Sequence, residues 1–379
     1  MHDSETVANL GIPLGADLSA IERELTEFWG TASQRAGETA TIRACSCNLM
    51  VVVSGQAEAE ALPPVLADVA EWHPCRSLVA FQGLQDAEPD SPPMRGWIRV
   101  QCRRQSGGGP QVCSEVITIG VRREAAGGLA DTLASLLVPD LPVFLYWRSP
   151  RIADRDFVEA LIRLADLLIV DSEQSPAEIH NGGQQLGILA PAPRRIAIRD
   201  LAWSRLTAWR DLIAQFFDTQ ASRSLLKELT EVEIQCVVSP RGGIPKIALL
   251  LAGWLASRLS WRTATAEQRH GEWISRMAGP DGDILIRFTS SPAGSTQGVI
   301  GAVTLRTRSG NLFSVSENRE QACMTATATG PAAKPVMHTV PCLSTAEADL
   351  LVGELSLPGE DTGFQAALAA ASALETSLR

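Results

Sequence analysis

The sequence has no run of five or more charges of one sign, and none of its apolar runs is long enough to cross a membrane. The longest run, residues 247–256, has about half of the roughly 20 residues that a membrane-spanning helix needs, so it predicts a buried core helix. The net charge of the 379-residue chain is −10, whereas nucleic-acid binding takes a concentrated basic face. We therefore expect neither a nucleic-acid partner nor a membrane partner.

The eight cysteines do not follow the spacing of common zinc sites. The sequence has no C-x-x-C and no Cys/His cluster with zinc-finger spacing, so we expect no metal site. Because residues 1–11 also lack the basic and apolar regions of a secretion signal, we expect a cytoplasmic protein with buried, reduced thiols. Cys45 and Cys47 would point to the same face of an extended chain, which makes them a candidate redox pair or a weak site for a soft metal.

The motifs of several large enzyme classes are missing. No G-x-G-x-x-G follows a strand, since the glycines at 107–109 lie in a predicted hairpin turn, and there is no P-loop, nucleophile elbow or H-E-x-x-H. His270-x-Glu272 lacks the P-C-x-x-C that zinc deaminases require. We therefore expect no catalytic residue and no cofactor.

Short apolar runs alternate with helical patterns between residues 41 and 205, and a helical pattern through Leu18, Leu25 and Phe28 marks residues 1–40 as a separate helical segment. The alternation predicts a Rossmann-like, mainly parallel sheet with an added antiparallel hairpin. The expected strands are 48–54, 77–81, 97–103, 111–121, 142–147, 167–170 and 194–198, and the expected helices are 63–70, 127–137 and 157–165.

The remainder, residues 206–379, predicts an α+β domain with an antiparallel sheet, reached through a helix over 201–217 that Asp200 would cap. The expected strands are 232–238, 283–288, 298–306, 311–315 and 321–328, and the expected helices are 222–229, 244–260, 343–355 and 362–378.

Asp171 and Ser172 are the most catalytic-looking residues, because they follow a predicted strand at the edge where open α/β sheets bind ligands. The alternative is that they shape the turn or cap the next helix. Trp147 and Arg148 end another predicted strand and have the same two interpretations.

The helix over 201–217 combines tryptophan and arginine on one face. Its apolar arc includes Trp203 and Trp209, and Arg205 and Arg210 lie near the two edges of that arc. These side chains could be anchors for another protein, a composition typical of binding hot spots. Alternatively, the tryptophans are core residues and the arginines pair internally, for example with Asp171 or Asp200.

Between residues 40 and 265 the sequence resembles the OpcA family of glucose-6-phosphate dehydrogenase assembly proteins. The Trp/Arg helix is the most specific match. The matching stretches are RACSCNLMVVV (43–53), HPCRSLV (73–79), VCSEVITI (112–119), VPDLPVFLYWR (138–148), ADLLIVDS (165–172), DLAWSRLTAWRDLIAQFFD (200–218) and GWLASRLSW (253–261).

The resemblance implies a non-catalytic protein that binds glucose-6-phosphate dehydrogenase, promotes its active oligomer and supports NADPH supply in the oxidative pentose phosphate pathway. In some members activation is tied to redox state, which adds Cys113 as a possible redox residue. Two departures from the family pattern are Cys113, which stands alone in place of a cysteine pair, and Thr207-Ala208 in place of Thr-Pro.

Two alternatives remain open from the sequence. One is an enzyme or sensor for sugar phosphates that uses the strand ends at Arg148, Asp171 and Ser172. The other is a scaffold that binds the dehydrogenase without changing its kinetics.

Overall fold

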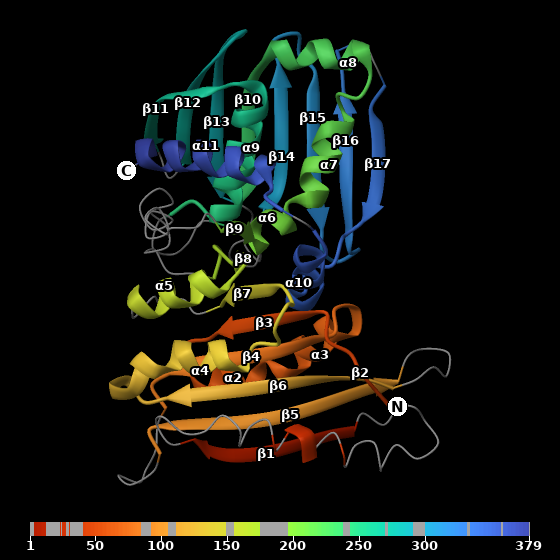
Figure 1. Ribbon diagram of the computed structural model, residues 1–379. Coiled ribbons are helices and arrows are strands. Elements are labelled where there is room, and N and C mark those ends of the chain that lie inside the picture. The colour runs from red at the N-terminus through yellow and green to blue at the C-terminus, as the bar shows by residue number, and fades with distance from the viewer. Residues whose placement is uncertain are drawn as a thin grey trace. The chain divides into compact units, whose positions relative to one another are not determined.

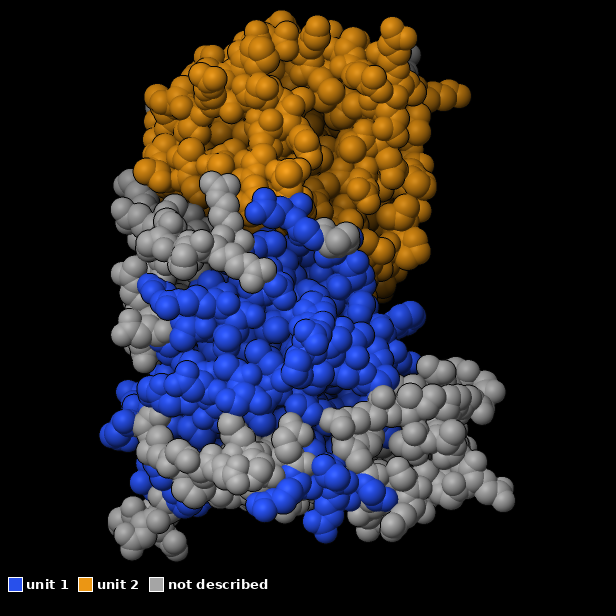
Figure 2. Space-filling view, viewed as in Figure 1, with its two compact units in different colours: residues 1–178, 188–199, 346–360 blue, residues 179–187, 200–345, 361–379 orange. Residues whose placement is uncertain are grey.

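The chain forms two compact units in the computed structural model (Figures 1 and 2). Unit 1 consists of residues 1–178, 188–199 and 346–360, and unit 2 of residues 179–187, 200–345 and 361–379. The sequence prediction instead places the boundary at 205/206, assigns 346–360 to the C-terminal domain and separates 1–40 from the domain that follows. The structure describes residues 4–12, 23, 25–27, 30, 41–84, 92–104, 111–148, 155–174, 196–237, 243–269, 272–290, 300–331, 334–357 and 359–378.

Unit 1 is built on a nine-stranded, mostly parallel sheet, which confirms the predicted fold class. Its order is β1-β5-β6-β4-β3-β7-β8-β9, and β2 pairs with β6. The strands β6, β4, β3, β7 and β8 are parallel to one another, whereas β5 is antiparallel to β6 and β1. The bounds are β1 Ser4–Ile12, β2 Thr41–Arg43, β3 Cys47–Val52, β4 Cys75–Gln82, β5 Met94–Arg104, β6 Gln111–Val121, β7 Val143–Trp147, β8 Leu167–Val170 and β9 Ala197–Asp200.

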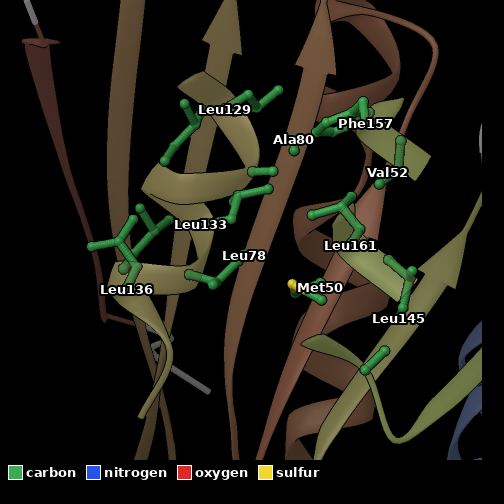
Figure 3. Close-up of a cluster of buried hydrophobic side chains, with 14 of the residues drawn as sticks. Met50, Val52, Leu78, Ala80, Leu129, Leu133, Leu136, Leu145, Phe157 and Leu161 are labelled. Atoms are coloured by element: carbon green, nitrogen blue, oxygen red, sulfur yellow. The ribbon is translucent and has the colours of Figure 1, made fainter. Parts of the chain in front are cut away.

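Helices cover both faces of this sheet. The side chains of α4 (Leu129–Leu136) and α5 (Arg155–Leu164) bury one face, and Figure 3 shows Leu133 and Leu161 packed among strand residues of that core. The other face packs against α2 (Gln56–Ala61) and α3 (Pro63–Trp72), and α10 (Glu347–Ser356) packs on α3. A 3₁₀ turn, η1 (Arg123–Gly128), precedes α4.

The sequence predicts one helical segment over residues 1–40, and the structure differs from this prediction. Residues 4–12 form β1, which pairs with β5 from Ser4 opposite Cys102 to Ile12 opposite Met94. Residues 23, 25–27 and 30 are helical, and the rest of the predicted helix, including Leu18 and Phe28, lies outside the described residues. In residues 4–12, pairing with the open edge of β5 rather than the local sequence pattern determines the structure, because a free strand edge is a template for pairing.

Unit 2 is built on an eight-stranded sheet of order β11-β12-β13-β10-β14-β15-β16-β17. All neighbours are antiparallel except β10 and β13, which confirms the predicted mainly antiparallel sheet. The sequence prediction lacked β11, β12 and β17. The bounds are β10 Leu229–Cys236, β11 Arg262–Arg269, β12 Glu272–Gly279, β13 Gly282–Ser290, β14 Ile300–Thr307, β15 Leu312–Asn318, β16 Cys323–Thr329 and β17 Val336–Pro341.

The predicted helix over 201–217 is two helices. Asp200 caps α6 (Leu201–Arg205) by accepting from the Ala202 backbone N–H at 2.9 Å, as predicted. Leu206 then interrupts the helix with φ −82° and ψ −4°, and α7 (Thr207–Gln215) begins. The break lies two residues before Ala208, where the family pattern places proline. Further helical elements of unit 2 are α8 (Gln220–Ser224), η3 (Leu225–Glu228), α9 (Lys246–Leu259) and α11 (Thr362–Leu378).

Candidate functional site

Four polar side chains meet at the carboxyl end of β7, and we call them the Arg148 cluster: Glu58, Tyr146, Arg148 and Glu347. Arg148 donates from Nε to Glu347 Oε1 at 2.6 Å and from Nη1 to Glu58. The Tyr146 hydroxyl donates to the same Glu347 oxygen at 2.9 Å. One guanidinium therefore joins α2, β7 and α10 within unit 1.

The position of the Arg148 cluster is the one where open α/β sheets usually bind ligands. From β3 the chain crosses to β4 on one side, and from β7 it crosses to β8 on the other, so the strand order reverses between β3 and β7. Glu58 Oε2 accepts from the Ser54 backbone N–H at 2.8 Å, just before α2. A carboxylate thus binds a backbone donor in the turn where a dinucleotide-binding protein holds phosphate.

Burial makes the Tyr146 phenol hard to ionise. Tyr146 is fully buried, and desolvation, followed by the negative charge of Glu347, raises its pKa far above the ordinary value. Since the folded state holds the phenolic proton more tightly than the unfolded state, this contribution to stability is complete below the ordinary pKa of about 10. It is lost as the pH rises above that value.

This shift can be measured directly, because Tyr146 is the one tyrosine of the chain. In a spectrophotometric titration we expect no phenolate absorbance one unit above the ordinary tyrosine pKa of about 10 while circular dichroism still reports folded protein. Phenolate should appear together with alkaline unfolding. The variant Tyr146→Phe is the zero-signal control, and titration near pH 10 in folded protein would contradict the buried cluster.

Asp171 and Ser172 shape a turn. They take no part in the ion pairs that Arg148 forms in the cluster. The Asp171 side chain is buried, and its Oδ1 accepts from the Glu173 backbone N–H at 3.3 Å. Its charge adds to the electrostatic environment of Tyr146. The structure therefore favours the turn interpretation that the sequence left open.

The tryptophans proposed as partner contacts are core side chains in the structure. Trp147, Trp203 and Trp209 are 5, 5 and 6% exposed. Trp203 Nε1 donates to Asp361 at 2.8 Å, and the Arg210 guanidinium stacks 3.5 Å from the Trp203 ring centroid. Arg205 is half-buried. Burial removes these rings from the surface that a partner would contact, which supports the internal interpretation of the helix.

The thiols are arranged differently from the predicted Cys45–Cys47 pair. The Cys45 thiol donates to the Cys47 carbonyl at 3.4 Å, whereas the Cys47 side chain hydrogen-bonds to Cys75 on the adjacent parallel strand. That bond lowers the pKa of Cys47, and the same bond together with burial raises the pKa of Cys75. Cys113 is disulfide-bonded, which corrects the expectation that the buried cysteines are reduced; in the β5–β6 ladder it lies opposite Cys102.

A cavity of about 280 Å³ lies elsewhere on unit 1, where α2 and α3 leave part of the sheet uncovered. Its lining includes Glu60, Phe81, Trp97 and Thr118. The Phe81 and Trp97 rings stack with centroids 6.0 Å apart. Phe81 can lie against β6 because position 120 is glycine: a Cβ there would be 2.4 Å from the ring. The sequence offered no sign of this cavity.

Two absences hold for the described residues. No group of three or more His, Cys, Asp and Glu among them could hold a metal ion. No helix in the described part of the chain has the length and apolar character to span a membrane.

Of the cluster residues the sequence pointed only to Arg148; Tyr146 lies in the predicted strand but was not a predicted site residue, and Glu58 and Glu347 were not predicted either. They lie 90 and 199 positions from Arg148, so only the fold brings them together. The available signal was Arg148 itself, because a guanidinium following a buried strand needs carboxylate partners.

Solved structures share this fold at low sequence identity. An NAD-binding oxidoreductase from Klebsiella pneumoniae matches with a TM-score of 0.51 and 12% identity, covering 88% of this chain and 96% of that one. The transcriptional regulator Gal80p from Kluyveromyces lactis matches with a TM-score of 0.50 and 9% identity, covering 88% and 92%. At these identities the likeness concerns the fold alone.

Curated relatives are similar in sequence over part of their length. Putative OxPP cycle proteins OpcA from Synechocystis sp. and Nostoc punctiforme are each 28% identical, over 54% and 56% of this chain. The OpcA protein of Synechococcus elongatus is 26% identical over 64% of this chain. The matches span 41%, 43% and 54% of those relatives, so the chain matches about half of their length.

Two models of one family match successive parts of the chain. The model for the N-terminal domain of the glucose-6-phosphate dehydrogenase subunit family matches residues 67–184, and the model for the C-terminal domain of the same family matches residues 196–368. Together they cover more than half of the sequence, in the order that the two domain names imply. The chain belongs to the OpcA family of glucose-6-phosphate dehydrogenase subunits.

Proposed function

We propose that this protein is a non-catalytic partner that binds glucose-6-phosphate dehydrogenase and favours its active oligomer. The family match supports the identity of the partner. The observation that carries the non-catalytic part is the Arg148 cluster, because Glu58 and Glu347 fill the reversal point of the sheet with paired charge. A phosphate entering there would meet two carboxylates and would have to displace them from Arg148.

The alternative of a sugar-phosphate site at Arg148 and Asp171 is not favoured for the same reason. Both groups already have partners: Arg148 is paired with two carboxylates, and Asp171 is buried and accepts a turn hydrogen bond. A substrate would gain little from a guanidinium already neutralised by its neighbours.

An assembly factor acts by shifting a population. If it binds the active state of the dehydrogenase more tightly than the inactive state, it lowers the free energy of the active state by the difference in binding free energy. Allosteric coupling between two sites commonly changes affinity by about 5- to 150-fold. The effect requires no chemistry in the chain itself.

The test is steady-state kinetics of the dehydrogenase from the same organism, with and without this protein. We expect the Michaelis constant for glucose 6-phosphate to fall by roughly 5-fold or more, or the turnover number to rise, in a saturable manner. This protein alone should convert neither glucose 6-phosphate nor NADP. Unchanged kinetics with demonstrated binding would support a scaffold, and turnover by this protein alone would overturn the proposal.

A further inference from the structure

Among the aromatic side chains of unit 1 that the structure describes, Trp72 is the most exposed. Trp72, the last residue of α3, is 71% exposed, and Leu357, which caps α10, is 52% exposed. Contiguous exposed apolar surface marks interaction sites, and tryptophan is one of the residues enriched in binding hot spots.

The ends of α3 and α10 are held together, so this surface is rigid. His73 Nε2 lies 2.9 Å from Ser356 Oγ and 3.2 Å from the Val352 carbonyl oxygen. The shorter of these contacts joins His73 and Ser356. Trp72 precedes His73 in the chain, and Leu357 follows Ser356. A preformed anchor loses little conformational entropy on binding.

Acidic residues border the tryptophan. Asp68 and Glu71 are exposed on α3, and Asp68 lies one helical turn before Trp72 on the same face. The whole chain carries a net charge of −10. The complementary surface is an apolar slot for an indole ring with lysine or arginine at its rim.

Another exposed apolar segment has a proline near each end of its outer edge. Val336 and Met337 are 68 and 70% exposed on β17, the edge strand of unit 2. The Cys342 backbone N–H donates to the Ala322 carbonyl oxygen. Because the backbone hydrogen-bonding groups of an antiparallel strand alternate in direction, those of the odd-numbered residues of β17 point away from β16. The outermost of these positions are Pro335 and Pro341, which lack the N–H that an added strand needs.

We propose that Trp72, with Asp68 and Glu71 near it on α3 and Leu357 at the adjoining end of α10, is the anchor that docks into glucose-6-phosphate dehydrogenase. All four residues fall within the stretches that the family's two domain models match. This inference rests on the proposed function, and it names the contact surface that the function requires.

The test is binding of purified dehydrogenase to the wild-type chain and to two variants, measured by light scattering and titration. Trp72→Ala should raise the dissociation constant about 30-fold or more, which corresponds to a hot-spot loss of about 2 kcal/mol. Met337→Ala is the matched control, equally exposed but on β17, and should bind like the wild type. Both variants should keep the wild-type circular dichroism spectrum, because neither side chain is buried.

The possible outcomes distinguish a wrong location of the anchor from a failure of the proposed function. If the wild-type chain binds and Trp72→Ala binds equally well, the anchor is elsewhere and the proposed function stands. If Trp72→Ala instead abolishes self-association of the chain alone, the surface serves a second copy and the inference is overturned. If the wild-type chain itself does not bind the dehydrogenase, the proposed function fails, and this inference fails with it.

Discussion

Replacing Glu115 with alanine is expected to destabilise the protein by about 3–5 kcal/mol, because it removes a carboxylate that is paired with a buried guanidinium. Arg76 and Glu115 lie opposite each other on β4 and β6, and both side chains are 5% exposed. The Arg76 guanidinium also donates from Nη1 to the Leu136 carbonyl at 2.9 Å, a bond that does not neutralise it.

Urea unfolding of Glu115→Ala and the wild type measures this effect. Asp283→Ala removes the partner of Arg276 from an ion pair that is more than half exposed on both sides, so it should cost less than about 1 kcal/mol. The double variant Arg76→Met with Glu115→Leu should recover much of the lost stability, since buried ion pairs can often be replaced by apolar residues of similar size. A loss below about 1 kcal/mol for Glu115→Ala would mean that Arg76 reaches water.

Replacing Gly253 with alanine is expected to destabilise unit 2 by roughly 1–3 kcal/mol, the usual cost of overpacking. Gly253 lies in α9 where that helix packs against α11. An added Cβ would be 2.3 Å from the Ala367 carbonyl oxygen and 2.7 Å from the Ala371 backbone nitrogen. Because both atoms belong to the backbone, the helices would have to move apart.

The control for this prediction is alanine at another helical glycine. Gly353 is exposed on α10, and an added Cβ there would meet no atom within 4 Å. Gly353→Ala should therefore stabilise the protein by about 0.5–1 kcal/mol through helix propensity and a less flexible unfolded chain. The same substitution should have opposite signs at the two positions in thermal or urea unfolding, and stabilisation at Gly253 would contradict the close packing of α9 and α11.

The fold was predictable where burial dominates the sequence pattern. The strands β3, β7 and β8 are short and mostly apolar, whereas α9 is a longer run that is apolar almost all round, so length separates the buried strands from the buried helix. The strands β11 and β17 were not predicted because they are mostly exposed and keep little alternation. Their pairing with neighbouring strands, rather than their own sequence, makes them strands.

The candidate site was predictable only in part. Arg148 and Tyr146 end an obvious strand, but their partners Glu58 and Glu347 come from α2 and α10, which the sequence does not place beside β7. The Trp/Arg helix left two interpretations open for a related reason. Its composition suits an interface, and the structure uses Trp203 and Trp209 to fill the core. Trp72 had no periodic pattern around it, and its exposure is visible only in the folded chain.

The central claim is that this protein acts by binding glucose-6-phosphate dehydrogenase, and the mass of the mixture tests it most directly. Multi-angle light scattering of the two purified proteins, run separately and together, should give a species heavier than either alone, with a fixed ratio of the two chains. Two unchanged masses, in both reducing and oxidising buffer, would contradict the account. The cavity beside Trp97 would then be the place to seek a function.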